Sequence, residues 1–207
     1  MTETEGVIRY RLDYSPGALP PEVPLSALFH WFAQCREKDL IGRDPTRYDG
    51  FAYGNISLRA DPGFIISGTQ TGAKPGLSAN DLSWVREVDP AHNRLSATGP
   101  AHPSSEAMTH GQVYLTLPAA DAVIHVHSRL IWRQALRLGL AQTAAAAGYG
   151  TPAMATEVER LLRSAAANSG AFAMSGHEDG IVAYAENMDV AGRLLLDLLK
   201  RARHGRS

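Results

Sequence analysis

The sequence predicts an α/β fold in three layers, α/β/α, with a central and mainly antiparallel sheet. Apolar residues change along the chain between the helical period of about 3.6 and the strand period of two. The expected elements follow in the order helix, four strands, helix, strand, helices, two strands, helix, which suits helices packed on the faces of an antiparallel sheet. With 207 residues, of which 44% are hydrophobic, we expect a single domain over residues 1–207 with a sizeable core.

The chain begins with an arm and a helix. The stretch "YSPGALPPEVP" at 14–24 holds four prolines, so we expect residues 1–23 to form an extended N-terminal arm before Pro24 opens a helix. Leu25, Leu28, Phe29 and Phe32 then recur at the spacing of one helix face. An amphipathic helix is predicted here.

Four short strands are expected next, in two hairpins. "ISLR" and "GFIIS" are joined by "ADPG", and "SWVREV" and "RLSATG" are joined by "DPAHN". Turn residues between apolar runs of period two are typical of antiparallel pairs.

The second half alternates helices and strands. We expect a helix from Ser104, a strand at 122–127, a helix at about 128–139 and another from Pro152. "GAFAMSG" and "GIVAYA" then flank a tight turn that contains His177, and Asn187 caps a last helix.

Composition excludes several classes of partner. The formal net charge of −1 argues against a surface for duplex nucleic acid, which needs a concentrated basic face. The basic tail "KRARHGRS" is better explained as the soluble end of a helix. Cys35 is the single cysteine, so no internal disulfide forms, and we expect a small core residue there. No segment has the roughly 18 apolar residues that span a bilayer, and we expect a cytoplasmic protein.

Two histidines stand out within the strand at 122–127. His125 and His127 are two residues apart, so both side chains point to the same face of the strand and can reach one metal ion. They can equally be hydrogen-bonded core residues. His177 lies in the glycine-flanked turn "GHEDG", where a hairpin would present it at the end of the sheet, and catalytic zinc sites usually take three protein ligands.

Five stretches in order resemble the class II aldolase/adducin family. They are "YGNISLR", "FIISGTQTG", "HPSSEAMTHGQVY", "AVIHVHS" and "GHEDGIVAYA", and the resemblance covers roughly residues 25 to 200. It implies that His125, His127 and His177 bind a divalent metal, most commonly zinc, with manganese, cobalt and iron as alternatives. It also implies that Glu106 is the acid/base residue. The residues that it assigns to substrate or phosphate are Asn55, Ser67, Gly68, Thr69, Ser104 and Ser105.

The resemblance implies a lyase that cleaves a small hydroxy-carbonyl compound, commonly a sugar phosphate, through a metal-stabilised enediolate. Two alternatives for this chain follow from the same resemblance: a metal-dependent dehydratase or epimerase, and a non-catalytic binding or scaffold domain like the adducin head domain. The family implies a homotetramer, in which we expect exposed Trp31 or Trp132 at an interface.

The C-terminal part departs from the family pattern. Several relatives use a tyrosine from a C-terminal tail or from a neighbouring subunit to handle the substrate aldehyde, and no tyrosine follows Tyr184 here. Tyr149, Glu178 and Asp179 are the candidates for the proton donor. Among the residues that directly follow the "SGTQTG" loop, only Lys74 is basic, so a carboxylate is an alternative to a phosphate on the substrate.

Overall fold

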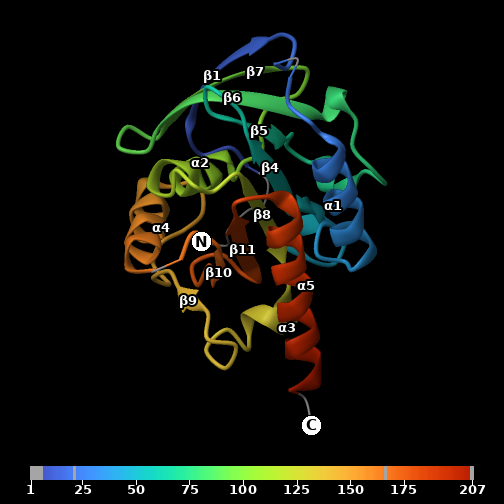
Figure 1. The fold of residues 1–207 in the computed structure, drawn as a ribbon, viewed down its shortest axis with the longest axis vertical. Coiled ribbons are helices and arrows are strands. Elements are labelled where there is room, and N and C mark those ends of the chain that lie inside the picture. The colour runs from blue at the N-terminus through green and yellow to red at the C-terminus, as the bar shows by residue number, and fades with distance from the viewer. Residues whose placement is uncertain (1–6, 21, 166, 206–207) are drawn as a thin grey trace.

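A nine-stranded sheet forms the centre of the protein. In the computed structural model, which describes residues 7–20, 22–165 and 167–205, the strands lie in the order β1-β7-β6-β5-β4-β8-β11-β10-β9 (Figure 1). The pairs β1–β7 and β9–β10, at the two ends of the sheet, are parallel, and the other pairs are antiparallel. The expected mixed α/β class with a large, mostly antiparallel sheet is therefore confirmed. The strands of this sheet are β1 (Arg11–Pro16), β4 (Asn55–Arg59), β5 (Phe64–Ser67), β6 (Leu82–Asp89), β7 (Arg94–Gly99), β8 (Ala122–His127), β9 (Ala141–Gln142), β10 (Gly170–Ala173) and β11 (Gly180–Ala185).

The two expected hairpins are confirmed. β4 pairs with β5 and β6 pairs with β7, both antiparallel. A separate two-stranded sheet joins β2 (Gly42–Arg43) to β3 (Ala52–Tyr53). Residues 44–51, between these two short strands, therefore form a loop whose ends are held together.

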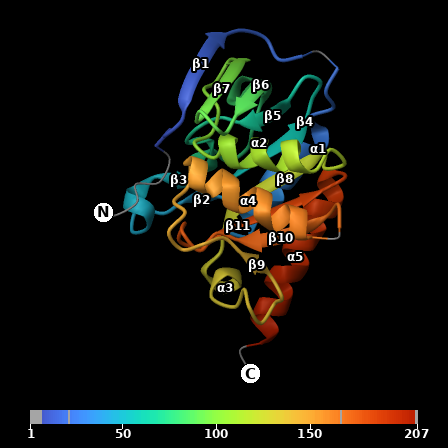
Figure 2. The same ribbon diagram turned by 90° about the vertical axis from the view of Figure 1, so that its left-hand side faces the viewer.

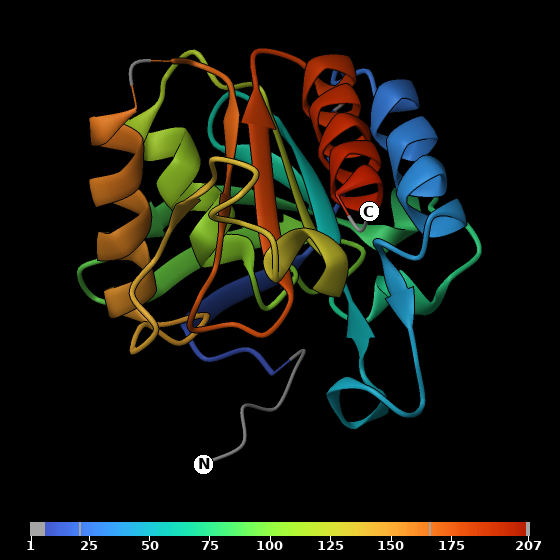
Figure 3. The same cartoon turned by 90° about the horizontal axis from the view of Figure 1, so that it is seen from below.

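Helices cover both faces of the large sheet. The helices α1 (Ser26–Glu37), α3 (Arg129–Trp132) and α5 (Met188–His204) pack together, as do α2 (Ala107–Thr116) and α4 (Pro152–Ser164). Figure 3 shows the blue and red helices on one side of the strands and the green and orange helices on the other, and Figure 2 shows α2 and α4 side by side in front of the sheet. None of the helices in the described part of the chain is both long and apolar enough to cross a membrane.

β8 contributes to both faces because neighbouring side chains of a strand alternate. Ile124 and Val126 belong to the apolar core beneath α1 and α5, and Val123 belongs to the core beneath α2 and α4. His125 and His127 lie on the same side as Val123. The alternation that the sequence predicted therefore turns both imidazoles away from α1 and α5.

Several helix ends match their sequence signals. α4 begins at Pro152, and the hydroxyl of Thr151 accepts a hydrogen bond from the backbone N–H of Met154 at 3.3 Å. α5 is capped by Asn187, whose Oδ1 accepts from the N–H of Val190 at 2.9 Å. These contacts satisfy N–H groups that have no partner within the helix.

Other expectations are corrected. The helix expected at 128–139 ends at Trp132, because several of the following hydrogen bonds run to the third residue back and Gly139 is left-handed with φ 75°. α2 begins at Ala107, three residues after Ser104. Trp31 is only 6% exposed, because its ring packs in the core between α1 and α5; its indole N–H donates to Asp189 Oδ1 on α5 at 2.6 Å. A buried Trp31 is not the exposed interface residue that we expected.

The N-terminal segment joins the sheet. Residues 11–16, within the stretch expected as an extended arm, form β1 and pair in parallel with β7. Residues 1–6 and 21 of that stretch lie outside the described residues. Cys35 is buried, as expected of a small core residue.

Candidate metal centre and active site

Three histidines come together where two interior strands of the sheet, β8 and β11, meet at one end. His125 and His127 end β8, and His177 lies in the turn between β10 and β11. One ring nitrogen of each lies within 4.8 Å of one ring nitrogen of both others, and all three residues are buried. The Nε2 atoms of His125 and His127 are 3.2 Å apart. The turn therefore places His177 beside the pair, as the sequence predicted.

Burial keeps two of these imidazoles neutral. Desolvation, followed by the influence of His177, holds the pKa of His125 and of His127 well below the usual value. His125 Nδ1 lies 3.2 Å from the carbonyl oxygen of Ile181. If Nδ1 carries the proton and donates to that carbonyl, Nε2 presents its lone pair to the other histidines.

The cluster fits a divalent transition metal. Two nitrogen ligands at about 2.0–2.1 Å from a tetrahedral zinc ion lie roughly 3.3 Å apart, close to the 3.2 Å between the Nε2 atoms of His125 and His127. Neutral imidazoles are the form that binds metal. A set of three protein ligands leaves one position of a tetrahedral ion for water or substrate, as in catalytic sites.

Glu106 directly precedes α2 and is fully buried. Its backbone N–H donates to Ser104 Oγ at 3.2 Å, and the carbonyl of Ser104 accepts from the hydroxyl of Tyr10 at 2.7 Å. Burial raises the pKa of Tyr10, and the charge of Glu106 raises it further. One turn along α2, His110 contributes to the lowered pKa of His125, so the start of this helix lies near the histidine cluster.

The residues expected to bind substrate or phosphate lie next to one another. Asn55 pairs in register with His125, and Asn55 Oδ1 is buried without a hydrogen bond to any described residue. Gly68 forms a bridge with Pro103, and the N–H of Thr69 donates to the carbonyl of His102 at 3.0 Å. The "SGTQTG" loop therefore lies against the segment that contains buried Ser104 and Ser105.

Several donors of this loop are already used within the protein. The N–H of Gly68 donates to Asp81 O at 2.8 Å, and the N–H of Thr69 donates to His102 O at 3.0 Å. Lys74, the cation expected near the loop, forms an ion pair with Asp81. Fewer groups are thus available to an anion than the loop sequence suggests.

Sequence reasoning missed the loop between β2 and β3. The ring of Tyr48 meets the ring of His127 edge to face, with centroids 4.6 Å apart. The hydroxyl of Tyr48 donates to Asp179 Oδ2 at 2.8 Å, and Arg47 Nη2 donates to the same oxygen at 2.8 Å. Burial, followed by this hydrogen bond, raises the pKa of Tyr48. A loop has no periodic pattern, so nothing in the sequence connected Arg47 or Tyr48 with the histidines.

Tyr149, one of the candidate proton donors, is fully buried against His177, with ring centroids 4.8 Å apart. Its hydroxyl lies 3.3 Å from both the backbone nitrogen and the carbonyl oxygen of Val7, and the guanidinium of Arg9 stacks over its ring at 4.2 Å. The N-terminal segment therefore supports the side of the site that contains His177.

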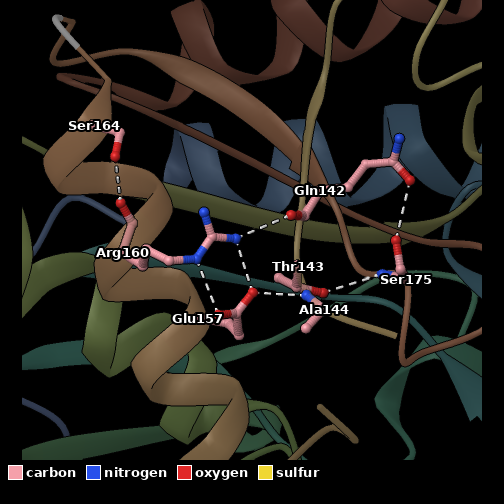
Figure 4. A network of polar contacts seen from close by, with 7 residues as sticks. All are labelled: Gln142, Thr143, Ala144, Glu157, Arg160, Ser164 and Ser175. Carbon is pink, nitrogen blue, oxygen red and sulfur yellow. Dashed lines mark hydrogen bonds and ion pairs between the residues drawn. The ribbon is translucent and has the colours of Figure 1, made fainter. Parts of the chain in front are cut away.

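A polar network connects Ser175, which precedes His177 by two residues, to α4 (Figure 4). Ser175 donates from its backbone N–H to Thr143 Oγ1 at 3.1 Å, and from its hydroxyl to Gln142 Oε1 at 3.0 Å. The N–H of Ala144 donates to Glu157 Oε2 on α4 at 2.7 Å. The chain that leads into the turn of His177 is thus held by hydrogen bonds to residues 142–144, which are in turn bonded to α4.

Comparison with known proteins gives similar folds. The family model for the Class II Aldolase and Adducin N-terminal domain matches residues 45–203. No curated protein sequence matches the chain. Among solved structures, L-fuculose-1-phosphate aldolase from Thermus thermophilus is 21% identical, with a TM-score of 0.64 over 86% of this chain and 90% of that one.

Two further structures are similar to the chain. A putative aldolase/epimerase/decarboxylase from Klebsiella pneumoniae is 20% identical, with a TM-score of 0.61 over 84% of each chain. A sugar-phosphate aldolase from Thermotoga maritima is 13% identical, with a TM-score of 0.64 over 85% of this chain and 90% of that one. At these identities, the similarity concerns the fold.

Proposed function

The chain belongs to the class II aldolase and adducin family, and on that premise we propose that it is a divalent-metal-dependent lyase acting on a small hydroxy-carbonyl compound. The observation that supports this most directly is the cluster of His125, His127 and His177, whose ring nitrogens lie within 4.8 Å of one another. We assign the metal to these three residues, with zinc as the first choice.

The proposed reaction is aldol cleavage. A divalent cation at the histidines would polarise the substrate carbonyl and lower the cost of the negative charge that develops on it. Glu106 is the proposed acid/base residue: its carboxylate takes the proton of the substrate hydroxyl as the carbon–carbon bond breaks, and returns it to the carbon that is left. Full burial of Glu106 keeps bulk water from competing for that proton.

The substrate is proposed to be a sugar phosphate. Asn55 would face the reacting end, since Asn55 is the register partner of His125 and its Oδ1 has no hydrogen bond to a described residue. Ser67, Gly68, Thr69, Ser104 and Ser105 would surround the anionic end. Because the N–H groups of Gly68 and Thr69 already donate to carbonyl oxygens within the protein, substrates that carry a carboxylate in place of the phosphate should be tested alongside the sugar phosphates.

The test is a screen of the zinc-loaded protein against phosphorylated ketoses and against aldols that carry a carboxylate, with release of the aldehyde product as the readout. Glu106→Gln is the control, because it keeps the shape of the side chain and removes the base. We expect its turnover to fall by about 10²–10⁴-fold. Turnover that is unaffected by Glu106→Gln would contradict the assigned role.

Metal binding is tested separately from turnover. We expect the protein purified without chelator to contain one divalent metal per chain, and His125→Ala to lose it. A metal content that stays the same in His125→Ala would remove the basis of the proposal.

We also propose that the protein is a cytoplasmic homotetramer of single α/β/α-layered domains that span residues 1–207. The half-buried Trp132 is the remaining aromatic candidate for a subunit contact. Light scattering should give four times the chain mass of 22.3 kDa, and a monomeric mass would overturn this assembly.

A further inference from the structure

We propose that Arg47, Tyr48 and Asp179 form a clamp that positions His127 and His177 for metal binding. These three residues act on the metal through His127 and His177 and are therefore positioning residues; for Asp179, whose Oδ2 accepts from Arg47 and Tyr48, this role takes the place of the proton donor considered from the sequence. The inference rests on the proposed function, because it assumes that the histidines bind a metal. It concerns the loop at 44–51 and the turn that follows His177.

Asp179 links the ends of the two strands that meet at the site. It lies two residues after His177, and its backbone carbonyl accepts a hydrogen bond from the N–H of Ser128 at 2.8 Å. Ser128 directly follows His127. One residue therefore ties the turn of His177 to the chain that leaves His127.

The side chain of Asp179 ties the same turn to the loop. Only 4% of this side chain is exposed, and its Oδ2 accepts from Arg47 Nη2 and from the hydroxyl of Tyr48, both at 2.8 Å. A buried carboxylate needs such partners, because burial removes its hydration. Both of these donors come from the loop at 44–51, so this loop cannot move away without depriving a buried charge of them.

The loop in turn packs against a proposed metal ligand. The ring of Tyr48 lies edge to face on His127 at 4.6 Å and on Tyr53 at 5.2 Å, while the guanidinium of Arg47 stacks over Tyr48 at 4.7 Å. Tyr48 and Asp179 both have positive φ angles, 51° and 62°. Such angles are uncommon outside glycine and persist where surrounding contacts hold them.

These contacts have a consequence for the metal. Three imidazoles bind one ion tightly only if their nitrogens converge, and supporting contacts outside the ligand set commonly change metal affinity by about 10–100-fold. The clamp controls the ring of His127 through Tyr48 and the backbone near His177 through Asp179. Loosening it should weaken metal binding although every ligand is still present.

The experiment uses cobalt(II) as the probe, because its visible absorption reports the coordination geometry. Metal-free wild type, Asp179→Asn, Tyr48→Phe, Arg47→Lys and Arg47→Ala are titrated with Co²⁺ in competition with a chelating dye. Asn suits the positive φ at residue 179, so Asp179→Asn removes the charge with little change of shape. The matched control is Asp189→Asn, which removes a carboxylate bonded to Trp31 at 2.6 Å on α5, away from the histidines.

We expect the affinity of Asp179→Asn for Co²⁺ to be lower than that of the wild type by a factor of about ten or more, and we expect the absorption spectrum of the bound ion to change. Tyr48→Phe should show a smaller effect in the same direction, and Arg47→Lys should retain more affinity than Arg47→Ala. Asp189→Asn should lower the melting temperature of the metal-free protein without changing the affinity or the spectrum.

Wild-type affinity and spectrum in both Asp179→Asn and Tyr48→Phe would overturn the clamp. If Asp179→Asn fails to fold, the result for Tyr48→Phe alone tests the clamp, because this variant removes only one hydroxyl group and should still fold. Failure of the proposed metal site would give a different result. The wild type would bind no Co²⁺, or His125→Ala would bind Co²⁺ with the same affinity as the wild type. Either result would also contradict the clamp.

Discussion

The two faces of β8 show how one strand serves both stability and chemistry. Towards α1 and α5, the strand presents Ile124 and Val126 to an apolar core. Towards α2 and α4, it presents His125 and His127, two buried polar side chains. The apolar face needs only neighbours of suitable volume, whereas each imidazole needs a partner with a nitrogen or oxygen atom in a defined place.

The partners of the histidine face come from distant parts of the chain. Asn55 is on β4, Tyr48 is in the loop before β3, and His177 and Asp179 are in the turn before β11. Changes on the apolar face should therefore affect stability and leave the site intact. Changes on the histidine face should affect the site and the pH dependence of stability.

The largest expected effect on stability is that of Ile124→Ala. Ile124 is fully buried, and removing its side chain leaves a cavity, so we expect the free energy of unfolding to fall by about 2–5 kcal/mol. Urea unfolding of the metal-free protein measures this loss. The affinity of the folded protein for Co²⁺ should stay at the wild-type value, and a large loss of affinity would contradict the separation of the two faces.

His125→Ala tests the histidine face of β8, as Ile124→Ala tests the apolar face. Because a metal that binds only the folded state adds stability, this variant should fail to gain stability when Co²⁺ is added. Equal stabilisation of His125→Ala and wild type by Co²⁺ would show that the ion binds elsewhere.

The regular elements on both faces of β8 were predictable from the sequence. Period-two alternation around His125 placed both imidazoles on one side of β8, and the helical spacing of Leu25 and Leu28 gave α1. Trp31 was misplaced because it lies off that apolar stripe, and its burial depends on packing against α5. Such a contact between distant helices has no signature in the local sequence.

The candidate site was predictable where it lies on regular structure. His125 and His127 follow from the strand, and the glycine-flanked turn indicated His177. Tyr48 and Arg47 were not predicted as part of the site, because they lie in a loop. Tyr48 has a φ of 51°, a backbone angle that sequence propensity does not predict for tyrosine. The helix expected at 128–139 was wrong for a related reason: its hydrogen bonds change to tight turns after Trp132.

The next effect in size concerns His110, a buried residue of α2, the helix that covers the histidine face of β8. Burial lowers the pKa of His110 from 6.5 to about 3, so below pH 6.5 the unfolded chain binds a proton that the folded protein does not bind. The stability associated with His110 is therefore fully present above pH 6.5. It is lost by up to about 1.4 kcal/mol for each pH unit as the pH falls from 6.5 towards the folded-state pKa of about 3.

His110→Asn tests this dependence. Asn can replace His110 Nδ1 in its 2.7 Å contact with Ser57 Oγ but does not titrate. In urea unfolding of the metal-free protein between pH 6.5 and 4.5, the slope of stability against pH should be shallower for the variant, whatever its stability at pH 7. His125 and His127 contribute in the same direction, so some slope should persist, and identical slopes would contradict the assignment.

The smallest effect lies on the apolar face, at the cap of α5. Asn187 Oδ1 accepts from the N–H of Val190 at 2.9 Å in an exposed position, and loss of such a cap costs about 1 kcal/mol. Asn187→Ala should lower the free energy of unfolding by that amount at every pH. Since α5 packs against α1 and α3 on the face opposite His125, the Co²⁺ affinity and spectrum should not change. A spectral change in Asn187→Ala would mean that the two faces of the sheet are mechanically coupled, and that β8 does not separate stability from metal binding.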